Sequence, residues 1–440
     1  AALLGAAPVA LPAQAATAVA PGRVSAAVAN DTLTSSFEVA GIPVILRRTT
    51  ANDVVAANLY LLGGARQVTM ENAGIETFLL TASERGTRKY PKAELRRTMA
   101  RLGTAIVVNP STDWTLLGTR ATTATFDSTW VVLADRLMQP TLDSAEVEQV
   151  RDQYLSAVRQ RRESPDALLE HLADSVAFAG HPYGIDPTGS EQSIAGLTVS
   201  DLRRYQQTQM VRSRMLLVVV GNVERARVER LVRATIGRLP AGTYKWTPPP
   251  PLPSGAGVAV EAASLPTNYI LGYFNGPPAT SPDYQAMRIA SAVLSGRLFN
   301  EIRVKRNLTY AVNSPFLERA IAAGGLYVTT ADPNQVVRIM RGVVDELKGG
   351  TISQSGLSEL TLQFITEYFL DNETNADQAD FLAQAQLYRG DWRAANRFVD
   401  ELEQVTPEDV RRVANSYFQD VRWAYVGDPR QVPRAAFEGF

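Results

Sequence analysis

Apolar residues along the chain follow two spacings, one typical of strands and one typical of helices. Short runs rich in β-branched and aliphatic residues, such as 36–47 and 54–62, predict strands, and residues 49–53 between them predict a turn. Longer segments such as 146–162 carry apolar residues three or four positions apart and predict amphipathic helices. Because strands and helices do not alternate strictly, the pattern predicts an α+β fold. The same criteria predict further strands at 104–108, 114–121, 215–220, 268–274, 310–317 and 325–330, and further helices at 92–102, 126–138, 167–179, 199–209, 225–236, 284–294, 334–348, 357–370 and 377–387.

The segment 73–87, AGIETFLLTASERGT, predicts a buried helix after the second strand. Ile75, Phe78 and Leu79 lie at near-helical spacing, and Gly86 ends the run. The strand that leads into this helix, 54–62, is either an edge strand able to pair with an extended peptide or a strand packed beside its neighbours. Its residues fit both arrangements.

A proline-rich segment near the middle of the chain predicts a domain boundary. Residues 246–257, WTPPPPLPSGAG, suit neither a helix nor a sheet, and four consecutive prolines favour a stiff polyproline segment. We therefore expect an N-terminal domain at 31–245, a linker at 246–257 and a C-terminal domain at 258–440.

An internal repeat supports this division. Residues 197–204, LTVSDLRR, are echoed 208 positions later by residues 405–412, VTPEDVRR. Thr198 and Thr406 suit helix N-caps, where a side-chain oxygen accepts a hydrogen bond from an unpaired backbone N–H. Each copy is followed by a tyrosine-bearing helix, an apolar strand and a glycine with a polar neighbour. We interpret the two halves as duplicated modules.

Composition narrows the classes of function. A chain of 440 residues exceeds the usual size of a single core, and its net charge of −1 favours neither nucleic acid nor an anionic membrane as partner. The absence of cysteine excludes disulfides and thiol chemistry. The only two histidines are His171, expected on a helix surface, and His181, expected to shape a turn before Pro182. Two histidines are a poor supply for a metal site.

The first thirty residues differ from the rest of the chain in composition. Residues 1–15, AALLGAAPVALPAQA, are rich in alanine and proline and end in a small-x-small triplet. They predict the end of a secretory signal peptide, with a disordered arm as the alternative, and therefore a periplasmic or secreted protein. No later run of about 18 apolar residues predicts a membrane span.

Several short motifs, taken in order, resemble the pitrilysin/insulinase family of inverted-zincin metallopeptidases, in particular its two-chain members. The resemblance extends over about residues 36–428. It implies two homologous α/β-sandwich modules, each a mixed and largely antiparallel sheet covered by helices, which together form half of a clamshell. The motifs are the frame of 73–87, HPYG at 181–184, VVGN at 219–222, RLFNEIR at 297–303 and LTY at 308–310.

The catalytic residues of that family are missing from this chain. The family binds zinc through H-x-x-E-H on a helix and a glutamate about 75 residues later. Alignment of the motif places Thr77, Leu80, Thr81 and Ala157 at those positions. None of these side chains supplies a histidine or carboxylate ligand or a general base, so the resemblance implies no cofactor in this chain and zinc in a partner subunit.

In two-chain members the subunit without zinc supplies an arginine and a tyrosine separated by six residues. Arg303 and Tyr310 match this pair by type and spacing. A guanidinium and a phenol are fixed donors that can stabilise the oxyanion of peptide hydrolysis. The simpler interpretation is an arginine at a solvated helix end and an ordinary strand tyrosine. Glu76 and Glu84 form a weaker acid/base hypothesis, because no third group accompanies them.

The resemblance predicts an inactive subunit of a heterodimeric zinc metallopeptidase that processes or degrades peptides. Its partners would be a homologous zinc-bearing subunit and the peptide substrate, and Arg303 and Tyr310 would act in trans. One alternative is a structural subunit that assembles a larger complex without any role in proteolysis. Another is a homodimer that binds peptides without cleaving them.

Overall fold

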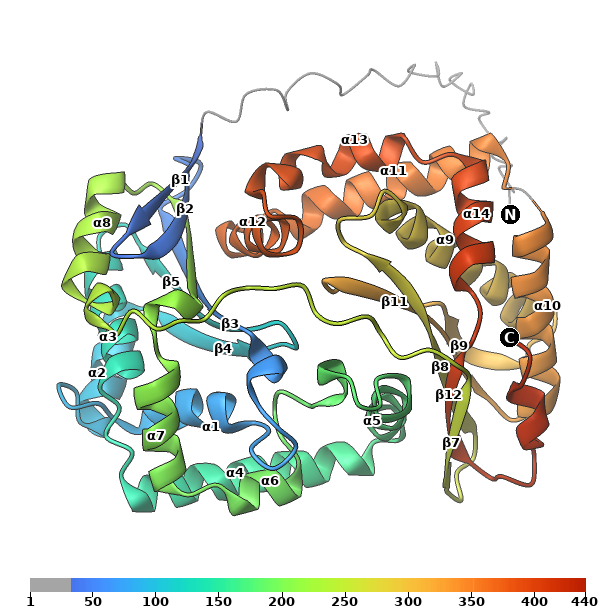
Figure 1. The fold of residues 1–440 in the computed structure, drawn as a ribbon, viewed down its shortest axis with the longest axis horizontal. Coiled ribbons are helices and arrows are strands. Elements are labelled where there is room, and N and C mark those ends of the chain that lie inside the picture. Colours follow the sequence, from blue (N-terminus) through green and yellow to red (C-terminus); the bar gives the residue numbers. More distant parts are fainter. Residues whose placement is uncertain (1–32, 351) are drawn as a thin grey trace, which may run out of the picture.

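The computed structural model describes residues 33–350 and 352–440, which fold into two six-stranded sheets with helices around them (Figure 1). All strands of the first sheet lie before residue 222, and all strands of the second lie after residue 256. The predicted signal peptide remnant, 1–30, lies outside the described residues. The α+β architecture predicted from the sequence is confirmed.

The first sheet has the order β1-β2-β6-β3-β5-β4. Only β2 and β6 pair in parallel; the other neighbours are antiparallel. Strand β3 lies between β6 and β5, so residues 54–62 form an interior strand and cannot pair with a peptide. Strand β4 is the edge strand on that side. The strands are β1 (Thr34–Val39), β2 (Ile42–Arg48), β3 (Val54–Leu62), β4 (Ala105–Pro110), β5 (Trp114–Thr122) and β6 (Met215–Gly221).

The single strand predicted over 36–47 is wrong, because the chain makes a hairpin there. Ala40 and Gly41 have φ angles of 53° and 82°, and they join β1 to β2 in an antiparallel pair. An alanine in this region of backbone space is uncommon, which is why the continuous apolar run concealed the turn.

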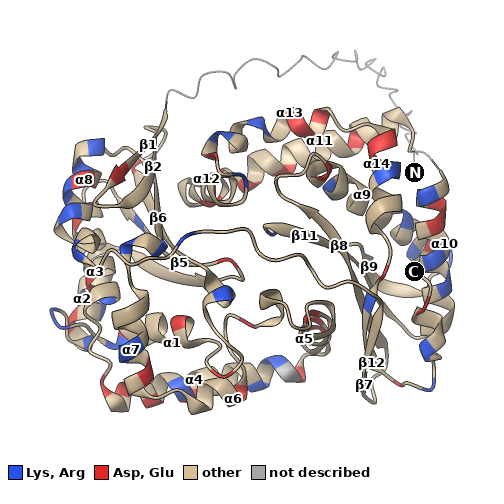
Figure 2. Ribbon diagram, in the orientation of Figure 1, with Lys and Arg blue, Asp and Glu red and all other residues tan. Residues whose placement is uncertain are grey.

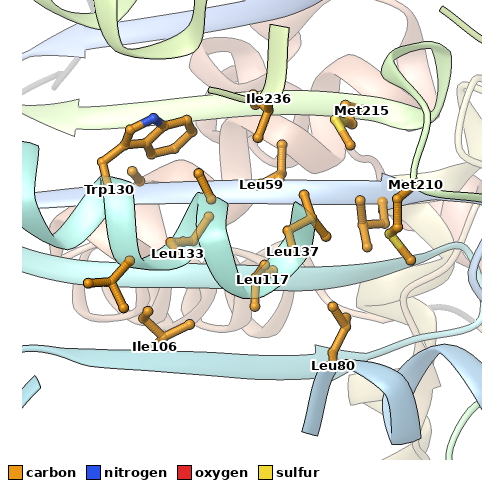
Figure 3. Close-up of a cluster of buried hydrophobic side chains, with 14 of the residues drawn as sticks. Leu59, Leu80, Ile106, Leu117, Trp130, Leu133, Leu137, Met210, Met215 and Ile236 are labelled. Atoms are coloured by element: carbon orange, nitrogen blue, oxygen red, sulfur yellow. The ribbon is translucent and has the colours of Figure 1, made fainter. Parts of the chain in front are cut away.

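Helices of the first half cover one face of the first sheet and build its core. Figure 3 shows Trp130, Leu133 and Leu137 of α3 facing Leu59 of β3 and Leu117 of β5. These side chains are almost fully buried, so the helix is fixed on the sheet by apolar packing. The helices of the first half are α1 (Ile75–Ala82), α2 (Lys92–Leu102), α3 (Phe126–Met138), α4 (Ser144–Glu163), α5 (Pro165–Ala177), α6 (Glu191–Gly196), α7 (Val199–Gln209) and α8 (Arg225–Ala234). Of these, α5 packs on the second sheet instead.

The second sheet has the order β10-β11-β8-β12-β7, with β9 also paired to β11. The strand predicted at 310–317 is divided into β9 and β10 by Ser314 and Pro315. The elements are β7 (Gly257–Ala262), β8 (Asn268–Pro278), β9 (Thr309–Asn313), β10 (Phe316–Leu317), β11 (Ile321–Thr330) and β12 (Arg422–Gly427), with α9 (Asp283–Leu298), α10 (Pro333–Gly349), α11 (Gln354–Asp371), α12 (Asn375–Arg389), α13 (Phe398–Glu403) and α14 (Pro407–Tyr417).

The internal repeat has the same structure in both halves. Thr198 begins α7 and Thr406 begins α14, each in a capping box with an aspartate three residues later. The strands that follow, β6 and β12, end at Gly221 and Gly427, whose φ angles are 147° and 157°. A side chain at either glycine would collide with the first residue of the neighbouring strand, β3 or β8. The two copies of the repeat therefore share the same helix cap and the same glycine requirement at the end of the following strand.

Each sheet is covered on its second face by a helix from the other half. Leu382 and Ala383 of α12 share a buried cluster with Tyr60 of β3, and Asn58 of β3 donates to Asp380 at 2.9 Å. Leu169 of α5 likewise packs in a cluster with residues of β8 and β12, beside which α5 lies in Figure 1. The predicted domain boundaries therefore separate the strands of the two sheets, but helices α5 and α12 each pack on the sheet of the other half.

Residues 240–256, which contain most of the predicted linker, form neither a helix nor a strand. Hydrogen bonds hold this segment at several points along its length. Arg66 donates to the carbonyl of Thr247 at 2.7 Å and lies over the ring of Trp246. His181 contacts the carbonyl of Pro250 through Nε2, at 3.0 Å. Asn275 and Arg422 donate to the carbonyl of Pro253, so the linker is attached to both halves of the chain.

Charged residues of both signs are interspersed on the outer helices. Figure 2 shows Lys and Arg beside Asp and Glu along α4, α8 and α10, whereas the strands are mostly uncharged. Within residues 33–350 and 352–440, no helix combines the length and apolar character that a membrane span requires.

Candidate functional site

Helix α1 carries three of the four positions at which the resemblance expects zinc chemistry. Thr77 is buried and its hydroxyl donates to the carbonyl of Pro187 at 2.8 Å. Thr81 shares a hydrogen bond of 3.2 Å with the hydroxyl of Tyr154 on α4. Leu80 is buried, and Figure 3 shows its side chain at the edge of the first core cluster. All three side chains are occupied by contacts within the protein.

The fourth position, Ala157, lies on α4 and is exposed. Tyr154, three residues earlier on α4, reaches α1, where its ring packs against Phe78 with 5.8 Å between centroids. The guanidinium of Arg151 lies over the ring of Phe78, 5.4 Å from its centroid. An arginine and a tyrosine hydroxyl thus accompany α1 here.

These residues do not fit a zinc ion. Zinc in proteins takes imidazole, thiolate or carboxylate ligands, and the four positions offer two hydroxyls and two apolar side chains. In the part of the chain that the structure describes, no group of three or more His, Cys, Asp or Glu residues could hold a metal ion. No step of metal chemistry is therefore assigned to this chain's own residues.

Glu76 and Glu84 serve two separate ion pairs and do not form an acid/base pair. Glu76 is buried and lies 2.9 Å from the guanidinium of Arg214, and Tyr205 donates its hydroxyl to the same carboxylate at 3.0 Å. Glu84 pairs with Arg136 on α3 at 3.1 Å. Both glutamates fix α1 and its C-terminal end to neighbouring elements.

The two histidines have different surroundings, as the sequence predicted. Nδ1 of His181 accepts a hydrogen bond from the backbone of Tyr183 at 3.0 Å, which holds the turn. Burial lowers the pKa of His181, so its ring stays neutral and can donate to the linker through Nε2. His171 is exposed on α5.

The structure brings Arg303 and Tyr310 together. A π-helical turn, Phe299–Val304, continues α9, and the chain then reverses at Asn307, whose φ is 51°. The backbone amide of Asn307 donates to the carbonyl of Arg303 at 3.0 Å. This reversal returns the chain to β9, where the ring of Tyr310 lies 5.2 Å from the Arg303 guanidinium carbon.

Both side chains have free donors. Tyr310 is 84% exposed, and Arg303 is exposed as well. Across residues 33–350 and 352–440, no partner accepts a hydrogen bond or forms an ion pair with the guanidinium of Arg303 or the hydroxyl of Tyr310. Neighbouring cations are engaged: Arg306, for example, contacts Glu301 at 2.6 Å. The pair is therefore placed by cation–π stacking and is able to donate to another molecule.

Phe299 belongs to this cluster, although the RLFNEIR motif gave it no role. Its ring centroid lies 5.2 Å from the Arg303 guanidinium carbon, and its side chain is 42% exposed. The spacing of four residues between Phe299 and Arg303 was the available signal. Arg303 is thus held between two aromatic rings.

Within this chain, the cluster of Phe299, Arg303 and Tyr310 lies far from α1. Figure 1 shows α1 beside the first sheet and β9 in the second sheet, on opposite sides of the molecule. The two candidate regions therefore do not form one site within the chain.

Comparison with known proteins agrees with this architecture. A family model described as insulinase (peptidase family M16) matches residues 43–188, and one described as the peptidase M16 inactive domain matches residues 196–364. The chain belongs to the M16 peptidase family. The word "inactive" in the second description refers to a domain that does not contain α1, so it does not explain the substitutions at Thr77 or Leu80.

Relatives within the M16 family include subunits and half-length structures. The beta subunit of the mitochondrial-processing peptidase of Blastocladiella emersonii is 24% identical over 400 residues, which cover 86% of this chain and 85% of that protein. The structure of a peptidase M16 inactive domain from Pseudomonas fluorescens is 18% identical with a TM-score of 0.81, covering 90% of this chain and 98% of that chain. The periplasmic protease PqqL from Escherichia coli, 16% identical with a TM-score of 0.75, matches 93% of this chain over 48% of its own. These likenesses confirm the fold expected for half of a clamshell.

Proposed function

We propose that this chain is the inactive subunit of a heterodimeric zinc metallopeptidase, and that it supplies Arg303 and Tyr310 to a peptide held at the partner's zinc. The observation that carries this proposal is the exposed, stacked pair, whose donors have no acceptor in the described part of the chain. An oxyanion forming at the partner's metal is an acceptor of suitable charge. The partner would be a homologous M16 chain with an intact H-x-x-E-H motif.

The contacts at α1 support this division of roles. Thr77 and Thr81 hydrogen bond within the protein, and Leu80 is part of the core. These positions serve stability within this chain, which supports a metal centre supplied by another chain. The match to only about half of PqqL supports a second half of similar fold.

Localisation in the periplasm, or secretion, completes the proposal. It rests on the alanine-rich sequence of residues 1–15 with its small-x-small end. The second candidate function, a structural subunit of a larger complex, is favoured by the same loss of ligands at α1, but it leaves the exposed Arg303–Tyr310 pair without a role.

Isolation of the chain from its native host tests the proposal. We expect it to co-purify with a second M16 chain of intact H-x-x-E-H sequence and with stoichiometric zinc, measured by mass spectrometry and metal analysis. A partner that also lacks the motif, in a complex without zinc, would contradict the proposal and favour the structural alternative.

A further inference from the structure

A cavity of about 540 Å³ lies between helix α5 and the turn that joins β10 to β11. Its walls include the aromatic rings of Trp114, Tyr183 and Tyr388 and the aliphatic side chains of Val158 and Leu168. This volume is in the range of pockets that hold small molecules. The walls thus combine apolar surfaces with polar and charged side chains.

Two charged groups in the wall have no hydrogen-bond or ion-pair partner within the described residues. Oδ1 of Asp174 on α5 and Nη1 of Arg319 on the β10–β11 turn are both buried, and neither makes a hydrogen bond within the described residues. Within the described residues, Asp174 and Arg319 do not form an ion pair with each other. The guanidinium of Arg319 is nevertheless held in place, because its carbon lies 5.0 Å from the Phe178 centroid and 5.2 Å from that of Tyr183.

Other charged residues of the wall are paired or exposed. Arg161 lies 3.8 Å from Asp186, and Glu318 forms an ion pair with Arg288. Glu170 and His171 are exposed. Asp174 and Arg319 are therefore two half-buried wall residues, each with a fully buried charged atom that has no hydrogen bond or ion pair within the described residues. A buried charge without a partner destabilises a protein, so its retention points to a ligand.

We propose that this cavity binds a zwitterion of the size of an amino acid or dipeptide. The ammonium group contacts the carboxylate of Asp174, and the carboxylate of the ligand contacts the guanidinium of Arg319. Charge-assisted hydrogen bonds of this kind are about twice as strong as neutral ones, and a guanidinium holds a carboxylate in a fixed orientation. The apolar walls accept the side chain of the ligand. This site is separate from the Arg303–Tyr310 pair and does not depend on the function proposed above.

Isothermal titration calorimetry with four probes tests the binding. We expect leucine and leucyl-leucine to bind at pH 7.5, while N-acetyl-leucine, which lacks the ammonium, and leucinamide, which lacks the carboxylate, bind at least about tenfold more weakly than leucine. Absence of heat and of any thermal shift with leucine and leucyl-leucine at about 10 mM would overturn the proposal.

Two variants assign the contacts. In Asp174→Asn the preference for leucine over N-acetyl-leucine should disappear, and in Arg319→Gln the preference for leucine over leucinamide should disappear. Asp345→Asn and Arg338→Gln, at exposed positions of α10, are the matched controls and should bind as the native chain does. Native affinity and selectivity in both cavity variants would overturn the proposal.

A stability measurement shows that the Asp174→Asn variant is folded. Burial raises the pKa of Asp174 to about 6; Arg319 opposes this effect, while Asp186 and Glu170 add to it. The folded-state pKa lies above the unfolded value, so the carboxylate costs stability as the pH rises through about 4 to 6 and at every higher pH. Without ligand, Asp174→Asn should therefore have a higher Tm than the native chain at pH 7.5, and this difference should shrink at pH 4.5. A lower Tm at pH 7.5 would show that Asp174 has a structural partner, which would contradict the site.

Discussion

Arg303→Ala is expected to lower kcat of the assembled peptidase by about 100- to 1000-fold, and Tyr310→Phe by a similar factor. Each change removes one fixed donor from the pair that stacks at 5.2 Å and has no acceptor in the described part of its own chain. Loss of one oxyanion donor costs about 3–4 kcal/mol of transition-state stabilisation. Steady-state kinetics on a peptide substrate, with kcat and KM determined separately, measures the effect.

Arg306→Ala provides the matched control. Arg306 lies in the same turn and is also exposed, but its guanidinium already contacts Glu301 at 2.6 Å. We expect kcat to change less than about twofold in this variant, and zinc content and assembly to stay unchanged in all three, since exposed substitutions have small effects on stability. Native kcat in both Arg303→Ala and Tyr310→Phe would exclude a catalytic contribution from the pair.

Arg214→Met is expected to reduce the free energy of unfolding by about 3–5 kcal/mol. Arg214 is 1% exposed, and it connects Glu76 of α1 to the carbonyl of Leu62 at the end of β3, 2.9 Å from each. Removing the guanidinium leaves the Glu76 carboxylate buried without its cation. Burial and Glu76 also raise the pKa of Tyr205, so its hydroxyl stays protonated and becomes the main remaining donor to that carboxylate. Urea unfolding followed by circular dichroism gives the change.

A second substitution separates charge from packing in this pair. Glu76→Gln in the Arg214→Met background removes the uncompensated charge and keeps an acceptor for Tyr205, so it should recover more than about half of the lost stability. Arg225→Met is the control, because Arg225 pairs with Glu229 on an exposed helix face, where ion pairs contribute less than about 1 kcal/mol. Equal losses in Arg214→Met and Arg225→Met would contradict a structural role for the buried pair.

Local sequence rules located most elements of the fold because local and tertiary preferences agree in them. The echo between 197–204 and 405–412 correctly predicted two similar helices, since both threonines form capping boxes with an aspartate. The hairpin at Ala40 and Gly41 was missed because an alanine with positive φ is uncommon, and Gly41 alone, inside an apolar run, was too weak a turn signal.

The exchange of helices between the halves could not be predicted. The apolar face of 167–179 indicates that the helix is buried, but it does not say which of two sheets covers it. In the structure, α5 packs on the second sheet and α12 on the first. Contacts between distant segments determine such placements, and one sequence does not contain them.

Some candidate site residues could be predicted from the sequence and others only from the fold. Arg303 and Tyr310 were predicted because their spacing matches a family motif, and the structure brings them into contact. Whether they act in catalysis stays a prediction. Asp174 and Arg319 are 145 positions apart and belong to no motif, so only the fold places both in one cavity.

Peptide hydrolysis by separated and recombined subunits tests whether this chain completes the active site of a partner. This chain alone, its zinc-bearing partner alone and an equimolar mixture would be assayed on the same peptide at equal partner concentration. We expect no hydrolysis by this chain, little by the partner, and full activity in the mixture, which zinc chelation abolishes. Hydrolysis by this chain alone, or equal activity of the partner with and without it, would contradict a division of the active site between two chains.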